Sequence, residues 1–214
     1  MLVIGGHSRN IGKTSVVAGI IAALPEARWQ AIKITQYGHS VCEAEGDACH
    51  CAPSDPLHRF ALNEQKAPDC TDSGRYLAAG AARAWWLRTA QGNLGHAIPT
   101  LRHLLTQATH TIVESNSILR FIRPDLYIPV LDFTVSDIKD SARMFLARAD
   151  ALVIVGGRVG EKSEPLWQGV PERWLHKPKF KALPPCYAGA DLIDFVRRTL
   201  QGNPDASADD ALLR

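Results

Sequence analysis

The sequence has no hydrophobic run long enough to span a membrane. Its longest apolar stretch, residues 16–24, is about half of the ~20 residues that a bilayer requires. The N-terminus also lacks the basic segment followed by an apolar core that marks an exported chain. We therefore expect a cytoplasmic protein with no membrane partner.

The sequence also has little excess charge of either sign. Its 24 Lys and Arg residues oppose 22 Asp and Glu residues, which gives a formal net charge of +2. No broad electropositive surface is available to hold a nucleic-acid backbone, and we expect no nucleic-acid partner. Hydrophobic residues make up 46% of the chain and charged residues 21%, values that exclude a disordered chain or a coiled coil.

The length of the chain, 214 residues, fits a single domain, at roughly 150 residues per domain. We place this domain at residues 1–201. Residues 202–214 contain Asn, Pro, Asp and Ser, a composition that predicts a flexible tail.

Short apolar runs alternate along the chain with segments whose apolar residues recur at helical spacing. The runs predict strands at residues 2–4, 31–34, 111–113, 126–131 and 151–155. Helices are predicted from Thr14 onward, at Leu77, Ala81 and Trp85, at Leu101, Leu104 and Leu105, after an N-cap at Ser136, and over residues 191–200. This alternation implies an α/β fold, a three-layer α/β/α sandwich around a mostly parallel sheet.

A glycine-rich loop joins the first predicted strand to the first predicted helix. It reads Gly5-Gly6-His7-Ser8-Arg9-Asn10-Ile11-Gly12-Lys13-Thr14-Ser15 and is similar to the Walker A motif, with His7 where the motif has its first glycine. Backbone amides of such a loop converge on phosphate oxygens. We expect Gly6 and Ser8 to Ser15 to hold the phosphates of GTP or ATP, with Lys13 at the β- and γ-phosphates and Thr14 on Mg²⁺.

A P-loop protein also needs an acidic residue at the end of a neighbouring strand, to hold Mg²⁺ or to orient water. Glu114 and Asp132 both end predicted strands. We favour Glu114, because polar residues follow it at the carboxyl edge of the sheet, where open α/β folds bind ligands. Lys13 and Glu114 are therefore the predicted catalytic residues.

Two further charged residues are candidates for this site. Lys33 lies inside an apolar run, so it is predicted either to face phosphate or substrate or to lie exposed on an edge strand. Asp72 precedes a predicted helix and is either a second Mg²⁺ ligand or part of the helix cap.

Residues 36–74 show no periodicity and are predicted to form an insertion over the site. Cysteines gather there, and Cys42, Cys49, Cys51 and Cys70 offer four soft ligands that would hold Zn²⁺ and fasten a long loop. Reversible disulfide chemistry and incidental free thiols are the alternatives.

Several segments together resemble molybdopterin-guanine dinucleotide biosynthesis protein B, MobB. They are the loop with Gly12-Lys13-Thr14, the strand with Ile32-Lys33, the segment Thr71-Asp72-Ser73-Gly74-Arg75-Tyr76-Leu77-Ala78-Ala79-Gly80-Ala81, and the strand end Val113-Glu114. MobB is a P-loop protein of the same class as dethiobiotin synthetase, whose strand-end lysine and glutamate look similar to Lys33 and Glu114. This sequence has Ser115 where MobB has glycine after the glutamate, and it lacks an Asn-Lys-x-Asp guanine motif.

The resemblance implies a GTP-binding accessory protein of molybdenum cofactor maturation, a homodimer that acts with a cofactor-biosynthesis partner. We expect slow Mg²⁺-dependent hydrolysis. One alternative is an ATP-dependent ligase or kinase that acts on a small molecule, as dethiobiotin synthetase does. The other is a metal or cofactor carrier in which the nucleotide acts as a switch.

Overall fold

The computed structural model describes residues 1–37, 59–156 and 170–201. Its centre is an eight-stranded sheet with the order β3-β4-β2-β5-β1-β6-β7-β8. All neighbouring strands are parallel except β3, which pairs with β4 in the antiparallel sense. The strands are β1 (Leu2–Gly6), β2 (Gln30–Tyr37), β3 (Phe60–Glu64), β4 (Arg83–Ala90), β5 (Thr111–Glu114), β6 (Leu126–Asp132), β7 (Leu152–Val155) and β8 (Lys179–Ala182).

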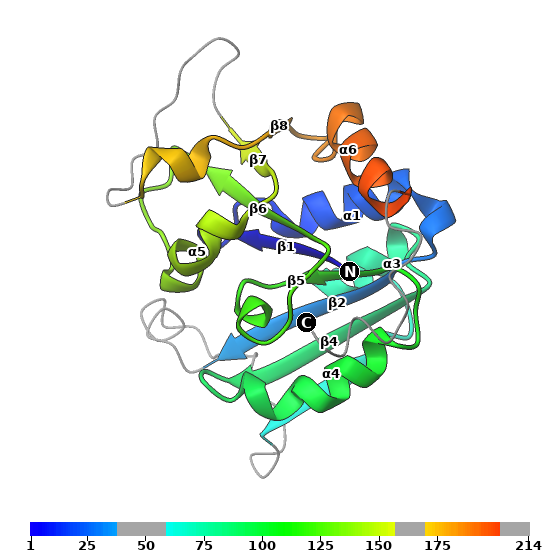
Figure 1. Ribbon diagram of the computed structural model, residues 1–214. Helices are drawn as coiled ribbons and strands as arrows, with labels where there is room; N and C mark the ends of the chain where they lie inside the picture. Colours follow the sequence, from blue (N-terminus) through cyan, green and yellow to red (C-terminus); the bar gives the residue numbers. More distant parts are fainter. Residues whose placement is uncertain (38–58, 157–169, 202–214) are drawn as a thin grey trace.

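Helices cover both faces of the sheet, as Figure 1 shows. One face packs against the helices α1 (Lys13–Ala23), α3 (Asp72–Ala78) and α6 (Ala190–Gln201) through one hydrophobic cluster. The opposite face packs against α4 (Ile98–Leu105) and α5 (Asp140–Phe145) through a second cluster. The fold is therefore the α/β/α sandwich that the alternation of strands and helices predicts. Among the described residues, no helix is long and apolar enough to span a membrane.

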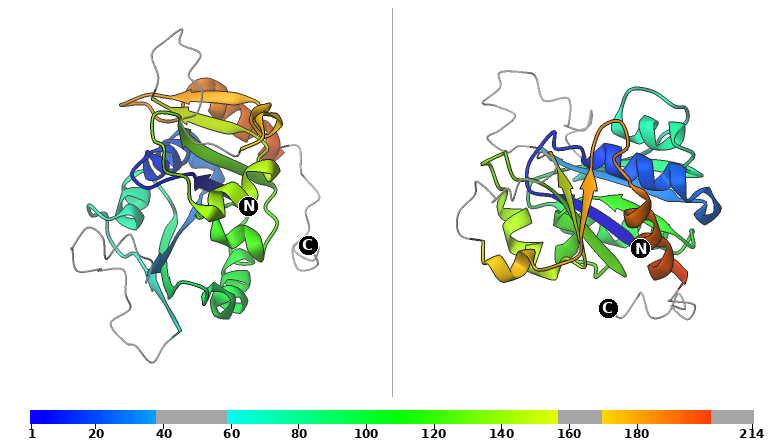
Figure 2. Two further views of the ribbon diagram at one scale, coloured as in Figure 1. Left: turned by 90° about the vertical axis from the view of Figure 1, so that its left-hand side faces the viewer. Right: turned by 90° about the horizontal axis from the view of Figure 1, so that it is seen from above.

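The central strands lie between these two clusters and are mostly apolar. All five residues of β1 and all four of β5 are buried, which is why these strands appear in the sequence as unbroken apolar runs. The strand directions rotate steadily from β8 at one edge to β3 at the other (Figure 2), as expected for strands with a right-handed twist. Because β1, β2 and β5 pair in parallel, their carboxyl ends meet at one edge of the sheet.

The fold corrects three predictions about local structure. No helix extends from Leu77 to Trp85: α3 ends at Ala78, Gly80 has φ +100°, and Trp85 lies in β4. Ser136 does not cap a helix, because α5 begins at Asp140 with Lys139 as its N-cap. Residues 36–74 are not wholly irregular, since β3 and the start of α3 fall within them.

Candidate functional site

The glycine-rich loop connects β1 to α1 at the carboxyl edge of the sheet. Gly12 has φ +86° and is the N-cap of α1, and Asn10 also has a positive φ, +53°. Among the described residues, no side chain caps the N-terminus of α1. The amides of the first helical turn have no partners within the helix and carry the positive end of its dipole. This end of α1 is therefore suited to an anion.

Lys13 folds back over the loop. Its Nζ donates a hydrogen bond to the Ser8 carbonyl oxygen at 2.6 Å, and its side chain passes beside Gly6. A Cβ on Gly6 would lie 2.5 Å from Lys13 Cδ, so only glycine leaves room for the lysine. Burial is the main cause that lowers the pKa of Lys13 to about 8.

His7 occupies the position of the first Walker A glycine and is fully buried. Its amide donates to the Val130 carbonyl oxygen at 3.3 Å, and its Nδ1 accepts a hydrogen bond from the Asp132 amide at 3.4 Å. The imidazole therefore packs against the end of β6. The small residue that Lys13 requires stands one position earlier, at Gly6.

Asn116 fixes the peptide groups of the loop in place. Its Oδ1 accepts a hydrogen bond from the Gly6 amide at 2.9 Å, and its Nδ2 donates to the Gly6 carbonyl oxygen at 2.8 Å. A Cβ on Gly5 would lie 2.1 Å from Asn116 Oδ1. The two consecutive glycines thus admit Asn116 at one residue and Lys13 at the next.

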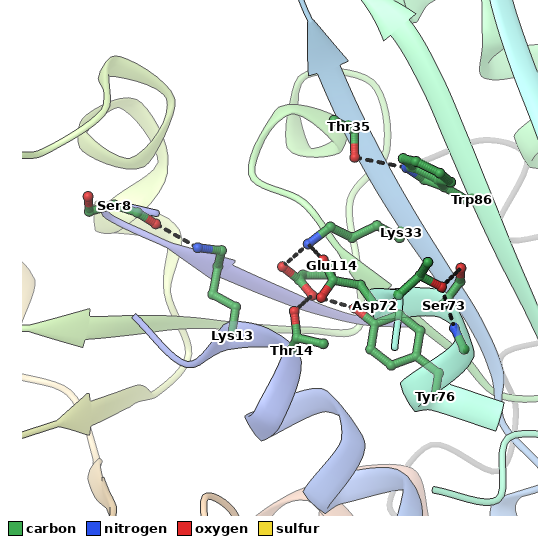
Figure 3. A network of polar contacts seen from close by, with 12 residues as sticks. Ser8, Lys13, Thr14, Lys33, Thr35, Asp72, Ser73, Tyr76, Trp86 and Glu114 are labelled. Atoms are coloured by element: carbon green, nitrogen blue, oxygen red, sulfur yellow. Dashed lines mark hydrogen bonds and ion pairs between the residues drawn. The ribbon is translucent and has the colours of Figure 1, made fainter. Parts of the chain in front are cut away.

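Glu114 is the centre of a buried polar network beside the loop (Figure 3). Its side chain is 2% exposed. Oε2 accepts hydrogen bonds from Thr14 Oγ1, at 2.8 Å, and from the Tyr76 hydroxyl, while Oε1 contacts Lys33 Nζ. Burial, together with the neighbouring carboxylate, raises the pKa of Tyr76 well above its usual value.

Lys33 bridges two carboxylates. It lies directly opposite Glu114 in the register of β2 and β5, and its Nζ is 2.8 Å from Asp72 Oδ2. Burial lowers the pKa of Lys33, but Glu114 and Asp72 outweigh this effect and raise it. Burial raises the pKa of Asp72, but Lys33 outweighs this effect and lowers it. Both groups are therefore charged at neutral pH.

Asp72 is the first residue of α3 and so lies in the N-cap region of that helix, as one of the two alternatives expected. The cap is Thr71, whose Oγ1 accepts a hydrogen bond from the Gly74 amide at 3.1 Å. Asp132, the second strand-end acid, accepts hydrogen bonds from the amide and hydroxyl of Thr134 at 2.9 and 2.6 Å. This is the local pattern of an Asx turn, so Asp132 stabilises the bend that follows β6.

The structure thus brings Lys13, Thr14, Lys33, Asp72 and Glu114 to one edge of the sheet (Figure 3). It also adds Tyr76, which sequence reasoning missed. Tyr76 follows Asp72 by four residues in α3, so the helical spacing of these two polar residues was the signal that would have identified it.

Of the four predicted zinc ligands, the structure describes only Cys70. Cys42, Cys49 and Cys51 lie outside the described residues, while Cys70 is an exposed free thiol. Among the described residues, no group of three or more His, Cys, Asp or Glu side chains is arranged to hold a metal ion. The zinc site therefore remains a prediction.

The strand order, the loop after β1 and the lysine at the start of α1 are those of the P-loop nucleoside triphosphatase fold. No protein-family model and no curated protein matches the sequence. Among solved structures it is similar to HypB from Helicobacter pylori in complex with nickel, at 14% sequence identity and a TM-score of 0.48. The match covers 94% of this chain and 87% of HypB. This similarity to HypB is too weak to support an assignment. The class therefore rests on the topology and the loop of the chain itself.

Proposed function

We propose that this chain is a Mg²⁺-dependent protein that binds a nucleoside triphosphate and hydrolyses it slowly. The observation that carries the proposal is the hydrogen bond from Thr14 Oγ1 to buried Glu114, immediately beside Lys13 on the loop. A strand-end carboxylate held against the hydroxyl at the start of α1 is the arrangement that a phosphate-bound Mg²⁺ requires. The resemblance to MobB extends the proposal to an accessory role in molybdenum cofactor maturation.

The residues at this edge fit Mg²⁺. The Thr14 hydroxyl donates a hydrogen bond to Glu114 and keeps its oxygen lone pairs for a cation. Mg²⁺ in nucleotide sites is held by few protein oxygens, because phosphates and water supply the rest. Thr14 would therefore bind the ion, with Glu114 and Asp72 nearby to accept hydrogen bonds from its water ligands. The ion would neutralise charge on the phosphates.

The network also explains why we expect hydrolysis to be slow. Glu114 receives hydrogen bonds from Thr14 and Tyr76 and pairs with Lys33. A carboxylate engaged by three donors orients its neighbours and is a poor acceptor for a proton from water. Lys13 would leave the Ser8 carbonyl and turn to the phosphates, where its charge stabilises the leaving group.

One observation favours a second function, ATP-dependent ligation or phosphorylation of a small molecule. The Lys33 ammonium group is held between Glu114 and Asp72, so a defined cation stands beside the expected position of the terminal phosphate. Such a cation would orient an anionic acceptor. ADP release that requires an added acceptor, with strict preference for ATP, would support this function over the accessory role.

Nucleotide binding is tested by thermal unfolding with GTP, ATP and their non-hydrolysable analogues, with and without Mg²⁺. Ligand at about 100 times its Kd should stabilise the protein by about 2.7 kcal/mol. The Lys13→Ala variant should lose this gain. Lys66→Ala is the matched control, because the Lys66 side chain is 80% exposed and pairs with Glu64 at the end of β3. Equal stabilisation of the Lys13→Ala variant, or none of the wild type, would overturn the proposal.

The same unfolding measurements identify the base that the protein prefers, and light scattering gives its oligomeric state. A Mg²⁺-dependent gain with guanine nucleotides alone supports the MobB-like role, whereas a gain with ATP alone supports the ligase or kinase. The homodimer belongs to the MobB-like proposal, and light scattering measures it directly. A monomer at micromolar concentration would contradict that part.

A further inference from the structure

The segment between β6 and α5 is attached to the phosphate loop. The Lys139 amide donates to the His7 carbonyl oxygen at 2.8 Å, and Ser8 Oγ donates to Asp137 Oδ2 at 2.7 Å. Two consecutive loop residues are therefore held by residues about 130 positions later in the chain. Asn116 Nδ2, which also binds Gly6, reaches Ser141 Oγ at 3.4 Å. Residues 137–141 thus contact the loop, or the Asn116 side chain that holds it, independently of α1.

This attachment places the backbone of Lys139 beside His7 in the loop. Lys139 is half-buried, and its charge acts on Lys13, Lys33 and Glu114 as well as on Arg9 and Asp137. Burial, followed by the charge of Arg9, lowers the pKa of Lys139 to about 8. Among the described residues, no carboxylate forms an ion pair with Lys139. Its neighbours therefore do not neutralise it in the way that Asp72 and Glu114 neutralise Lys33.

The charges of Lys13, Lys33 and Lys139 consequently act on one another, and within the described part of the chain only Lys33 is paired with carboxylates, those of Glu114 and Asp72. Like charges in a partly desolvated site oppose one another, and this arrangement is unfavourable unless a polyanion occupies the site. The amides of α1 and Lys13 account for the inner phosphates of a nucleotide. Residues 137–139 border the loop at His7 and Ser8, and the charge of Lys139 acts on Lys13, Lys33 and Glu114, so Lys139 is a further cation available to a terminal phosphate.

We propose that Lys139 binds the terminal phosphate of the nucleoside triphosphate, so that residues 137–139 distinguish the triphosphate from the diphosphate. This inference rests on the proposed function, since it assigns a ligand contact within the same site. A terminal phosphate that contacts Lys139 would be bound by the same segment that contacts His7 and Ser8. Loss of that phosphate would remove the contact with Lys139 while the diphosphate stays on the loop.

The test is the ratio of two affinities, measured by titration calorimetry on the full chain with Mg²⁺. The probes are a non-hydrolysable triphosphate analogue and the diphosphate of the base that stabilises the wild type more. For Lys139→Met we expect the triphosphate Kd to rise by at least about tenfold and the diphosphate Kd to change by less than about twofold. Lys139→Arg should restore most of the triphosphate affinity, and Lys66→Met should change neither constant.

Each outcome of the titration supports or overturns either the role of Lys139 or the proposed function. An unchanged ratio in Lys139→Met, whether both affinities stay or both fall together, would overturn the role of Lys139 and leave the proposed function intact. A wild type that binds neither nucleotide would overturn the proposed function itself. Lys139→Gln supplies the same test with a polar side chain, so that the ratio can be read even where methionine destabilises the fold.

Discussion

The Tyr76 hydroxyl donates a hydrogen bond to the Glu114 carboxylate. Both side chains are buried, and they come from different elements, α3 and β5. This contact connects the helix that carries Asp72 to the strand at the centre of the site. It holds Oε2 of Glu114, whereas Lys33 contacts Oε1.

Replacing Tyr76 with Phe removes the donor and retains the ring. A hydrogen bond to a charged group is worth about 1.5–3 kcal/mol, and we expect the free energy of unfolding to fall by that amount in urea. The matched control is Tyr127→Phe, because the Tyr127 hydroxyl makes only a 3.4 Å contact with Asn116 Oδ1. A loss no greater than that of the control would contradict the role assigned to Tyr76.

Replacing Lys33 with Met leaves Glu114 buried without its cation. Breaking a buried ion pair costs about 3–5 kcal/mol, so the variant should be strongly destabilised at neutral pH. Adding Glu114→Gln removes the unpaired charge, and the double variant should lose less than the sum of the two single variants. The four proteins form a double-mutant cycle in urea. Additive losses would mean that the two groups do not interact.

The pH dependence of the unliganded protein follows from Lys13 and Lys139. Their pKa values are about 8 in the fold, against an ordinary value of 10.5. Between these values the unfolded chain binds more protons, so the free energy of unfolding should rise from pH 8 to about pH 9.5. Nucleotide affinity should fall over the same range, because the neutral amines no longer attract phosphate. Lys13→Met should reduce both slopes, and a rise that persists unchanged would contradict the assignment.

Replacing Asn116 with Ala removes both hydrogen bonds to the Gly6 peptide groups. We expect a loss of about 1–3 kcal/mol in stability and a roughly tenfold weaker nucleotide affinity, because the loop no longer holds its shape. Calorimetry and urea unfolding measure the two effects. Ser117→Ala, in the same segment and bonded to Ser115 rather than to the loop, should change each by less than about 0.5 kcal/mol. Equal affinity in both variants would exclude a positioning role for Asn116.

The parallel fold follows from the sequence because its central strands are buried on both faces. Residues 2–4 and 111–113 appear as apolar runs for that reason and are confirmed as β1 and β5. Near the sheet edge this signal fails. Trp85 stands four residues after Ala81, which favours a helix, but the positive φ of Gly80 ends the helical path and Trp85 continues as a strand. The strand β8, with exposed Lys179 and Lys181, has too few apolar residues to be recognised.

The candidate site likewise contains some residues that a local sequence pattern identifies and others that it does not. Lys13 and Glu114 stand out locally, one by its loop and the other by ending an apolar strand. Asn116 and Lys139 act on the loop from more than a hundred residues away, and no local pattern marks such contacts. Their roles depend on which strands become neighbours, and this is decided by the tertiary packing of the chain.

The pairing of β2 with β5 places Lys33 directly opposite Glu114, and this register has a consequence for biosynthesis. A shift of one residue would turn Lys33 to the other face of the sheet. The register can be set only after β5 has been synthesised, and residues 137–139 are synthesised later still. A growing chain on the ribosome therefore carries Lys13 and its loop long before the proposed nucleotide site is complete. Ligand cannot assist the early steps of folding and can stabilise only the nearly finished domain.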